Sequence, residues 1–484
     1  MTNNEIIKMG VIETYENIIS GKVSAQSVTE AYLKQIEKCK DKNAVLEVFQ
    51  DSIENAKKID EKIKNGENVG KLAGVPIIIK DNMLYKGKKA TCASKFLENF
   101  ISPYTSTAVQ RLLDNDAIIL GRANMDEFAM GGSNENSAFG ACKNAHDDER
   151  VSGGSSGGSA VSVGCNMCAC ALGTDTGGSV RQPSSFNGVV GCKPTFGRIS
   201  RYGIVAFASS LDQVGPITKN VEDNAYIMQI LAGFDPNDQT SRTETPDDYR
   251  ANINNDIKGL RIGICKQLMD MYQKSDYINN FNSVKEFLSK NGATLVEITI
   301  PKIELCLPGY YIISGAEATS NLGRFDGVKY TSRFGINSDI NDLYVNSRTQ
   351  GFGKEVKRRI MIGNYVLSSG FFDAYYNKAK KVQQHLINSF QKAFEECDAI
   401  IMPCTYGEAF KIGEKSNDPV SMYLEDSFTV IANLASIPAI SVPYSKGKNN
   451  MPLGLQILTK QLNESTMYNV AKFVETNYKE QRYE

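Results

Sequence analysis

Short apolar runs rich in Ile, Val and Leu are the feature that most constrains the fold of this chain. Examples are GVPIIIK at 74–80, AIILG at 117–121 and AIIMP at 399–403. Aliphatic runs of this length without polar alternation are typical of strands that are buried on both faces. A sheet made of such strands needs helices on both sides, so the sequence predicts an α/β protein with a mixed or parallel sheet.

A strand-helix-strand unit is evident in the second half of the chain. LRIGIC at 260–265 and LVEITIP at 295–301 have strand character. Between them, Phe281, Val284 and Leu288 recur at the spacing of one helical face, the pattern of a helix that packs on a sheet. This unit supports the α/β prediction.

The pattern along the chain indicates one domain with helical additions. Residues 1–65 have helical periodicity and are predicted to lie at the periphery. Residues 303–395 contain no strand-like run and are predicted to be mostly helical. No internal repeat of fixed period is present, so residues 1–484 are predicted to form a single domain.

Charge balance and the scarcity of histidine exclude several classes of function. Lys and Arg number 54 and Asp and Glu number 55, which gives a formal net charge of -1. A protein that holds nucleic acid by its own charge needs a basic face, which this balance disfavours. A Ser-His-Asp hydrolase or a multi-histidine metal site would have to use His146 or His385, the two histidines of the chain. We therefore predict no metal site in this chain.

Cysteine usage bears on the cellular compartment. Eleven cysteines are scattered between Cys39 and Cys404. A near-neutral chain of this size without a charged-then-apolar leader is expected in the cytoplasm, with reduced thiols. No apolar run approaches the ~18 residues that a membrane-spanning helix requires, so no membrane contact is expected.

Two segments rich in glycine and serine differ from ordinary turns. They are SGGSSGGSA at 152–160 and GTDTGGSVRQPSS at 173–185. A Walker-type phosphate loop needs Lys and then Ser or Thr after its last glycine, whereas the first segment offers Ala160 and Val161. No G-x-G-x-x-G motif opens the first strand-helix unit either. Nucleotide binding by this chain is therefore disfavoured.

Lys80 and the serines of these segments can supply a hydrolytic site without histidine. A serine hydroxyl needs a neighbouring base before it becomes a nucleophile. Lys80 ends a strand that is predicted to be buried, and burial lowers the pKa of a lysine toward neutrality. The alternative role for this lysine is an ion pair with a carboxylate such as Asp81.

The second glycine-rich segment also offers an oxyanion hole. Because Gly177 and Gly178 let the backbone approach a ligand closely, the N–H groups from Thr176 to Ser179 can point at one position. The sequence thus predicts Thr176, Gly177 and Gly178 as oxyanion donors beside a serine nucleophile.

The combination of GVPIIIKDN, SGGSSGGSA and GTDTGGSVRQPSS resembles the amidase signature family. The resemblance covers most of the chain and implies an α/β/α sandwich with a mixed, mostly eleven-stranded sheet. It also implies a Ser-cisSer-Lys triad, with Ser179 as nucleophile, Ser155 as bridging serine and Lys80 as base. The cis peptide bond would join Ser155 to either Gly154 or Ser156.

Four further segments resemble a narrower family, the A subunits of bacterial aspartyl/glutamyl-tRNA amidotransferases. They span 123–140, 191–216, 355–363 and 423–443. This resemblance implies a carbon–nitrogen ligase in which the triad hydrolyses glutamine and ammonia passes to a partner protein. That partner would use ATP and Mg²⁺ to amidate tRNA-bound Glu or Asp, while this chain itself would carry no cofactor.

The same resemblance implies a heterotrimer with B and C subunits. Misacylated Glu-tRNA(Gln) would be contacted mainly through a partner, and the sequence leaves open whether Asp-tRNA(Asn) is amidated as well. The lining of the ammonia channel and the residues of the interfaces between subunits are not evident from the sequence.

The glutamine site that the resemblance implies consists of Tyr310, Arg359 and Asp426. Free glutamine carries a carboxylate and an ammonium, which bind well to a guanidinium and a carboxylate respectively. The neighbouring Tyr311 and Arg358 remain alternatives. This assignment makes the helical region between 303 and 395 part of the substrate site.

Two other functions remain open. A stand-alone amidase that acts on small or aryl amides would use the same triad without needing Arg359 and Asp426. A non-catalytic scaffold would be expected to lose the triad, which is intact here. Gly131 and Gly132 stand where serines or a threonine are common in the narrower family, and this departure is expected to alter the glutamine pocket slightly.

Overall fold

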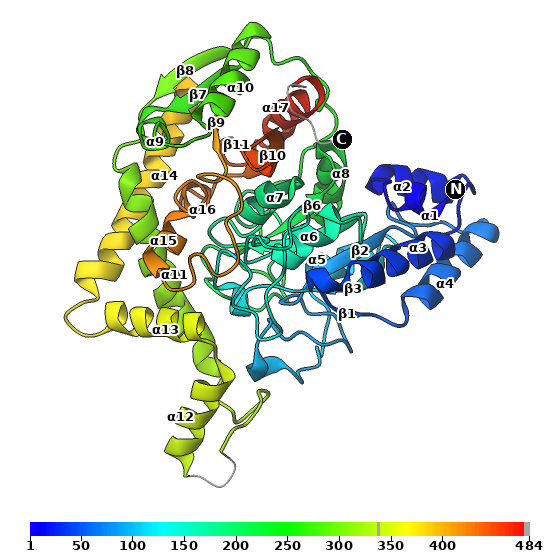
Figure 1. Ribbon diagram of the computed structural model, residues 1–484, viewed down its shortest axis with the longest axis horizontal. Coiled ribbons are helices and arrows are strands. Elements are labelled where there is room, and N and C mark those ends of the chain that lie inside the picture. The colour runs from blue at the N-terminus through cyan, green and yellow to red at the C-terminus, as the bar shows by residue number, and fades with distance from the viewer. Residues whose placement is uncertain (336–338, 479–484) are drawn as a thin grey trace.

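Eleven strands form one mixed sheet in the order β1-β3-β2-β4-β6-β5-β10-β11-β9-β7-β8. The structure is a computed structural model that describes residues 1–335 and 339–478 (Figure 1). Strands β2 and β3, β2 and β4, β7 and β8, and β7 and β9 pair in parallel, and the other neighbours pair antiparallel. The strands are β1 (Val45–Val48), β2 (Pro76–Lys80), β3 (Ile118–Ala123), β4 (Cys170–Asp175), β5 (Val190–Lys193), β6 (Gln213–Thr218), β7 (Arg261–Cys265), β8 (Thr294–Ile298), β9 (Ala399–Pro403), β10 (Ala439–Lys446) and β11 (Pro452–Leu458).

Helices surround the sheet and extend below it in the view of Figure 1. Within the described residues, none of them is both long and apolar enough to cross a membrane. The α-helices are α1 (Asn3–Ile6), α2 (Val11–Ile19), α3 (Ala25–Lys38), α4 (Ser52–Lys64), α5 (Thr107–Leu113), α6 (Gly157–Gly164), α7 (Arg181–Asn187), α8 (Val221–Leu231), α9 (Lys266–Tyr272), α10 (Ile278–Lys290), α11 (Cys306–Asn321), α12 (Ile340–Gly351), α13 (Lys354–Leu367), α14 (Lys378–Glu396), α15 (Pro419–Leu424), α16 (Val430–Leu434) and α17 (Glu464–Asn477).

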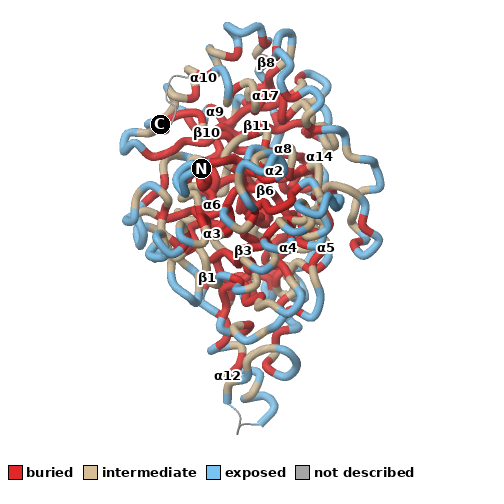
Figure 2. The backbone as a smooth tube through the Cα atoms, turned by 90° about the vertical axis from the view of Figure 1, so that its right-hand side faces the viewer, coloured by how far each residue is buried: buried red, intermediate tan, exposed pale blue. Residues whose placement is uncertain are grey.

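The core follows the sheet, as the buried backbone in Figure 2 shows. Every residue of β2, β3, β4, β5, β6, β9 and β11 is buried. Strands can be buried at every position only when both faces of the sheet are covered. The predicted α/β/α sandwich with an eleven-stranded mixed sheet is therefore confirmed, and the apolar runs at 74–80, 117–121 and 399–403 contain or overlap β2, β3 and β9.

Two helical regions were predicted, and the structure modifies one of them. Residues 303–395 hold α11 to α13, nearly all of α14 and short helical turns, and α12 projects away from the sheet (Figure 1). Residues 1–65 hold α1 to α4 but also supply β1, an edge strand that the prediction of helices alone missed. β1 has only four residues, and none of them is fully buried, so it lacks the apolar signature of the inner strands.

A substitution in the middle of the sheet tests this account of the core. Ile440 lies in β10 between β5 and β11 and has no exposed surface. We expect Ile440→Ala to lower the free energy of unfolding by about 2–5 kcal/mol, because it removes buried methyl groups and leaves a cavity. Val420→Ala, at a side chain that is 68% exposed, should change it by less than about 0.5 kcal/mol. Urea unfolding followed by circular dichroism measures both, and equal effects would contradict the assigned core.

Candidate active site

Lys80, the last residue of β2, is fully buried and surrounded by oxygen atoms. Its Nζ lies 2.7 Å from Ser155 Oγ and 2.8 Å from Ser156 Oγ. It also lies 3.0 Å from Thr174 Oγ1 in β4, the strand that pairs with β2. The lysine predicted as the base thus contacts the serine predicted as the bridging residue.

Burial controls the charge of this lysine. It lowers the pKa of Lys80 to about 7, although the carboxylates of Asp126, Asp175 and Asp212 act in the opposite direction. The alternative role, an ion pair with Asp81, is wrong. Asp81 instead accepts a hydrogen bond from Arg122 Nη1 at 2.7 Å. With the carboxylate next to it in the chain committed elsewhere, Lys80 can lose its proton near neutral pH.

Ser155 lies in the loop before α6 and follows a cis peptide bond. The bond is Gly154–Ser155, one of the two that the sequence left open. The carbonyl of Ser155 accepts a hydrogen bond from Asp126 N at 3.2 Å, and the N–H of Ser156 donates to the carbonyl of Ser179 at 3.1 Å. This last bond holds the two glycine-rich segments side by side, so that Ser179 lies next to the Lys80–Ser155 pair.

Ser179 lies in the turn between β4 and α7, and a buried ion pair holds this turn. Asp175 Oδ1 accepts hydrogen bonds from Gly178 N at 2.8 Å and from Arg181 Nη2 at 2.9 Å. Burial alone would raise the pKa of Asp175, but the Arg181 guanidinium holds it well below its usual value. Asn433 Oδ1 in α16 accepts a further hydrogen bond from Arg181 Nη2 at 2.7 Å. The nucleophile is therefore carried on a turn fixed by a permanently charged pair.

One predicted oxyanion donor has to be corrected. The N–H of Gly178 is donated to Asp175, because the buried carboxylate needs partners, so it is not available to an oxyanion. The N–H groups of Thr176, Gly177 and Ser179 make no hydrogen bond to the described residues. Gly178 has φ of +132°, and a side chain there would collide with Thr429 of the loop before α16.

A cavity of about 260 Å³ contains several of the predicted substrate residues. Tyr311, Arg359 and Asp426 line it, as do Gly131 and Gly132. A side chain at Gly132 would have only ordinary contacts, at 3.8 Å or more, so the departure at this position enlarges the cavity without disturbing its wall.

Arg359 of α13 is the dominant charge in this cavity. The side chain is buried, its Nε donates to Glu355 Oε1 at 2.7 Å, and its Nη1 has no partner among the described residues. Its guanidinium carbon lies 4.5 Å from the ring centre of Tyr311 and 4.8 Å from that of Tyr423. A buried donor without a partner is costly, so this nitrogen is suited to bind an anionic ligand.

Asp426 provides the opposite charge. It follows α15, and its Oδ2 accepts a hydrogen bond from Tyr311 Oη at 2.6 Å. Burial raises the pKa of Asp426 to about 7, although Tyr311 and Arg359 oppose the rise. A cationic ligand in the cavity would favour the ionised form.

The alternatives at the neighbouring positions can now be separated by geometry. Arg358 is partly exposed and pairs with Glu355, whereas Arg359 has the free buried nitrogen. Tyr311 lines the cavity, while the ring of Tyr310 packs against Gly177 in the turn that carries the nucleophile. Both tyrosines therefore belong to the site, with different contacts.

The side chain of Gln182 connects the cavity to the catalytic loop. Its Nε2 donates to the carbonyl of Gly132 in the cavity wall at 2.8 Å, and its Oε1 accepts from the N–H of Gly154 at 2.9 Å. The sequence analysis missed Gln182, Ser156 and Thr174, although all three stand inside the motifs that it singled out.

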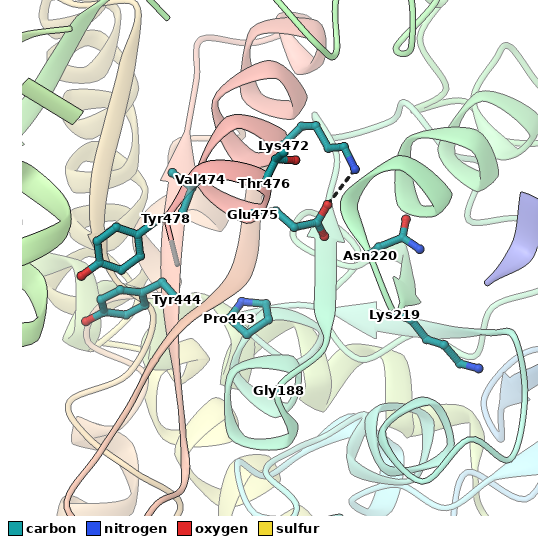
Figure 3. Close-up of a pocket in the computed structure, with 10 residues that line it drawn as sticks. All are labelled: Gly188, Lys219, Asn220, Pro443, Tyr444, Lys472, Val474, Glu475, Thr476 and Tyr478. Atoms are coloured by element: carbon teal, nitrogen blue, oxygen red, sulfur yellow. Dashed lines mark hydrogen bonds and ion pairs between the residues drawn. The ribbon is translucent and has the colours of Figure 1, made fainter. Parts of the chain in front are cut away.

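A second cavity, of about 400 Å³, is lined by none of these residues (Figure 3). It is bordered by α17, β10 and the loop before α8. Lys472 and Glu475 of α17 form an ion pair at 3.0 Å there, and Glu475 also accepts the N–H of Val221 at 2.7 Å. Because these charges already serve the α8–α17 contact, we assign this cavity a structural role. No group of three or more His, Cys, Asp or Glu side chains in the described residues could hold a metal ion.

The family model named Amidase matches residues 27–467. The chain belongs to the amidase family. Its relatives include the A subunit of the glutamyl-tRNA(Gln) amidotransferase of Thermoanaerobacter pseudethanolicus, 49% identical over 96% of both chains. The first of the numbered A subunits of this amidotransferase in Clostridium acetobutylicum is 48% identical over 98% of both. The predicted membership of the amidase signature family is thus confirmed.

Solved structures agree with this relationship. The A subunit of the glutamyl-tRNA(Gln) amidotransferase from Thermotoga maritima superposes with a TM-score of 0.78 at 37% identity, covering 99% of this chain and 94% of that one. The peptide amidase from Stenotrophomonas maltophilia superposes with a TM-score of 0.84 at 26% identity and 98% coverage of each chain. The overall fold is thus common to relatives of different named activities, so the substrate must be argued from the cavity.

The pKa of Lys80 sets the expected pH dependence. Below about pH 7 Lys80 is protonated and cannot accept a proton, so the rate of Ser179 inactivation by a fluorophosphonate should rise with pH and reach half its plateau near pH 7. Lys80→Met should lower this rate by about 10²–10⁴-fold at the plateau.

Lys193 provides a matched control. It is also fully buried with a pKa lowered to about 7 by burial, but its Nζ donates to the carbonyls of Pro194 and Ile437. Lys193→Met should leave the midpoint of the profile in place. A midpoint that moves in this variant and stays in Lys80→Met would assign the base to the wrong lysine.

Proposed function

We propose that this chain hydrolyses glutamine to supply ammonia within a tRNA-dependent amidotransferase. The observation that carries the proposal is the unpartnered, buried Nη1 of Arg359, in a cavity wall that also contains Asp426. A free amino acid carries one negative and one positive group, and these two residues match that pair of charges. The full-length identity to subunits named for this amidotransferase supports the same function.

Binding orients the substrate. Arg359 receives the α-carboxylate of glutamine and Asp426 its α-ammonium, while the side-chain amide extends toward the turn that carries Ser179. Tyr311 holds the Asp426 carboxylate in place through its hydrogen bond, and Tyr310 packs against Gly177 beside the reacting carbonyl.

The triad then performs acyl transfer. Neutral Lys80 accepts the proton of Ser155, Ser155 accepts that of Ser179, and Ser179 Oγ forms a bond to the amide carbon. The N–H groups of Thr176, Gly177 and Ser179 stabilise the resulting oxyanion. When the tetrahedral intermediate collapses, the C–N bond breaks and the relay returns a proton to the leaving nitrogen. Water then attacks the acyl-enzyme by the same relay and releases glutamate.

The partners and cofactors follow from this role. We propose that the chain functions in the cytoplasm in a heterotrimer with B and C subunits. There ATP and Mg²⁺ serve a partner that amidates Glu-tRNA(Gln), and any use of Asp-tRNA(Asn) depends on the same partner. The chain itself uses no cofactor in this scheme. The names of its relatives as subunits of a glutamyl-tRNA(Gln) amidotransferase support the assembly.

A stand-alone amidase for small amides is the second candidate. The structural similarity to the peptide amidase favours it, because the catalytic fold is shared. The charged cavity favours glutamine instead, since an apolar amide would leave Arg359 Nη1 buried and unpaired.

Ammonia release from glutamine tests the proposal directly. The chain, purified with the subunits that accompany it, should release ammonia, and addition of Glu-tRNA(Gln) and ATP should increase the rate. Ser179→Ala should abolish release because the acyl-enzyme cannot form. Ser162→Ala, at a buried serine of α6 that donates to a helix carbonyl, should retain it. Cleavage of simple amides with glutamine untouched would favour the stand-alone amidase.

The two neighbouring arginines give a sharper test of the cavity. Arg359→Lys should raise KM for glutamine about 10- to 100-fold with little effect on kcat, because a lysine cannot reproduce the planar pair of donors. Arg358→Lys, at a partly exposed side chain, should change KM by less than about threefold. Steady-state ammonia release at varied glutamine measures both, and a reversed order would assign the carboxylate to Arg358.

A further inference from the structure

The hydroxyl of Thr174 links the catalytic lysine to Asn82. Thr174 Oγ1 lies 3.0 Å from Lys80 Nζ and accepts a hydrogen bond from Asn82 Nδ2, also at 3.0 Å. Asn82 follows β2 by two residues and is 2% exposed. It makes no hydrogen bond to Lys80 itself, so its effect on the lysine passes through Thr174.

The hydrogen atoms around Lys80 Nζ can be assigned one by one. Ser156 Oγ donates its hydrogen to the carbonyl of Thr174 at 3.1 Å and accepts the Thr174 N–H at 3.3 Å. Ser156 can therefore only accept from Lys80. Asn82 Nδ2 donates to Thr174 Oγ1, so the hydroxyl hydrogen of Thr174 has Lys80 Nζ as its remaining acceptor.

This arrangement distinguishes the two charge states of the lysine. A neutral amine has one lone pair and can accept the Thr174 hydrogen, whereas an ammonium has three hydrogens and no lone pair. In the ammonium state the Thr174 hydroxyl hydrogen would stay buried without an acceptor, which is unfavourable. The same nitrogen lies 2.7 Å from Ser155 Oγ, where the catalytic proton is taken up.

We propose that Asn82 is a positioning residue that holds Lys80 in its neutral, proton-accepting form through the hydroxyl of Thr174. The inference depends on the proposed role of Lys80 as base but not on glutamine as the substrate. Burial of Lys80 acts in the same direction, while Asp126, Asp175, Asp212 and the thiol of Cys92 favour the ammonium.

Asn82→Asp reverses the polarity of this contact and provides the main test. A carboxylate at position 82 would accept the Thr174 hydrogen, which turns the Thr174 oxygen into an acceptor for the ammonium. We expect the pH profile of fluorophosphonate inactivation to move up by about one unit, so that inactivation at pH 6 slows about tenfold. Asn82→Ala should give a smaller shift in the same direction.

Asn224→Asp is the matched control for a buried charge. Asn224 has no exposed surface and contacts the Pro216 carbonyl and Tyr468, outside the site, so its profile should keep the midpoint of the wild-type chain. A thermal melt of each variant confirms folding. If Asn82→Asp does not fold, the comparison of Asn82→Ala with wild type carries the test.

A double-mutant cycle separates the Thr174 path from other effects of Asn82. In the Thr174→Val background, which removes the hydroxyl but keeps the shape, Asn82→Ala should no longer move the midpoint. An equal shift with and without the hydroxyl, or no shift in any Asn82 variant, would overturn the proposal. Loss of glutamine hydrolysis by the wild-type chain would refute only the proposed substrate, because inactivation of Ser179 is measured without glutamine.

Discussion

The burial of one lysine without an ion-pair partner is the constraint on which the site depends. A charged Lys80 would be costly in the sheet interior, so the surrounding groups must favour the neutral amine or supply hydrogen-bond acceptors. The structure does so with hydroxyl and carbonyl oxygens, while the carboxylate of Asp81, next in the chain, is drawn away by Arg122. A hydrolytic site without histidine is possible because the sheet itself tunes the base.

A second buried charge has the opposite task. Asp175 and Arg181 remain ionised, since each has several hydrogen-bond partners, and they hold the turn that presents Ser179. The fold thus contains one buried cation that is destabilised and one buried pair that is stabilised, both at the ends of neighbouring strands β2 and β4. Both are needed, because a nucleophile must be rigidly placed while its base must be free to change charge.

Sequence reasoning reached the fold where the local pattern and the burial agree. The uniform apolar runs of β2, β3 and β9 could be predicted because both faces of these strands are covered. β6, with the sequence QVGPIT, could not, because its glycine and proline are tolerated only through its neighbours in the sheet. The triad could be placed through the family resemblance, whereas the loss of Gly178 as an oxyanion donor required the position of the Asp175 carboxylate, which no spacing reveals.

The bridge formed by Gln182 has a consequence for how this protein can change its substrate. One amide group binds the cavity wall at Gly132 with its nitrogen and the catalytic loop at Gly154 with its oxygen. A substitution that shifts the wall to fit a different ligand would therefore pull on the peptide that places Ser155. Selectivity and reactivity are mechanically joined here, so a lineage that acquires a new substrate must repair the alignment of its catalytic serines at the same time.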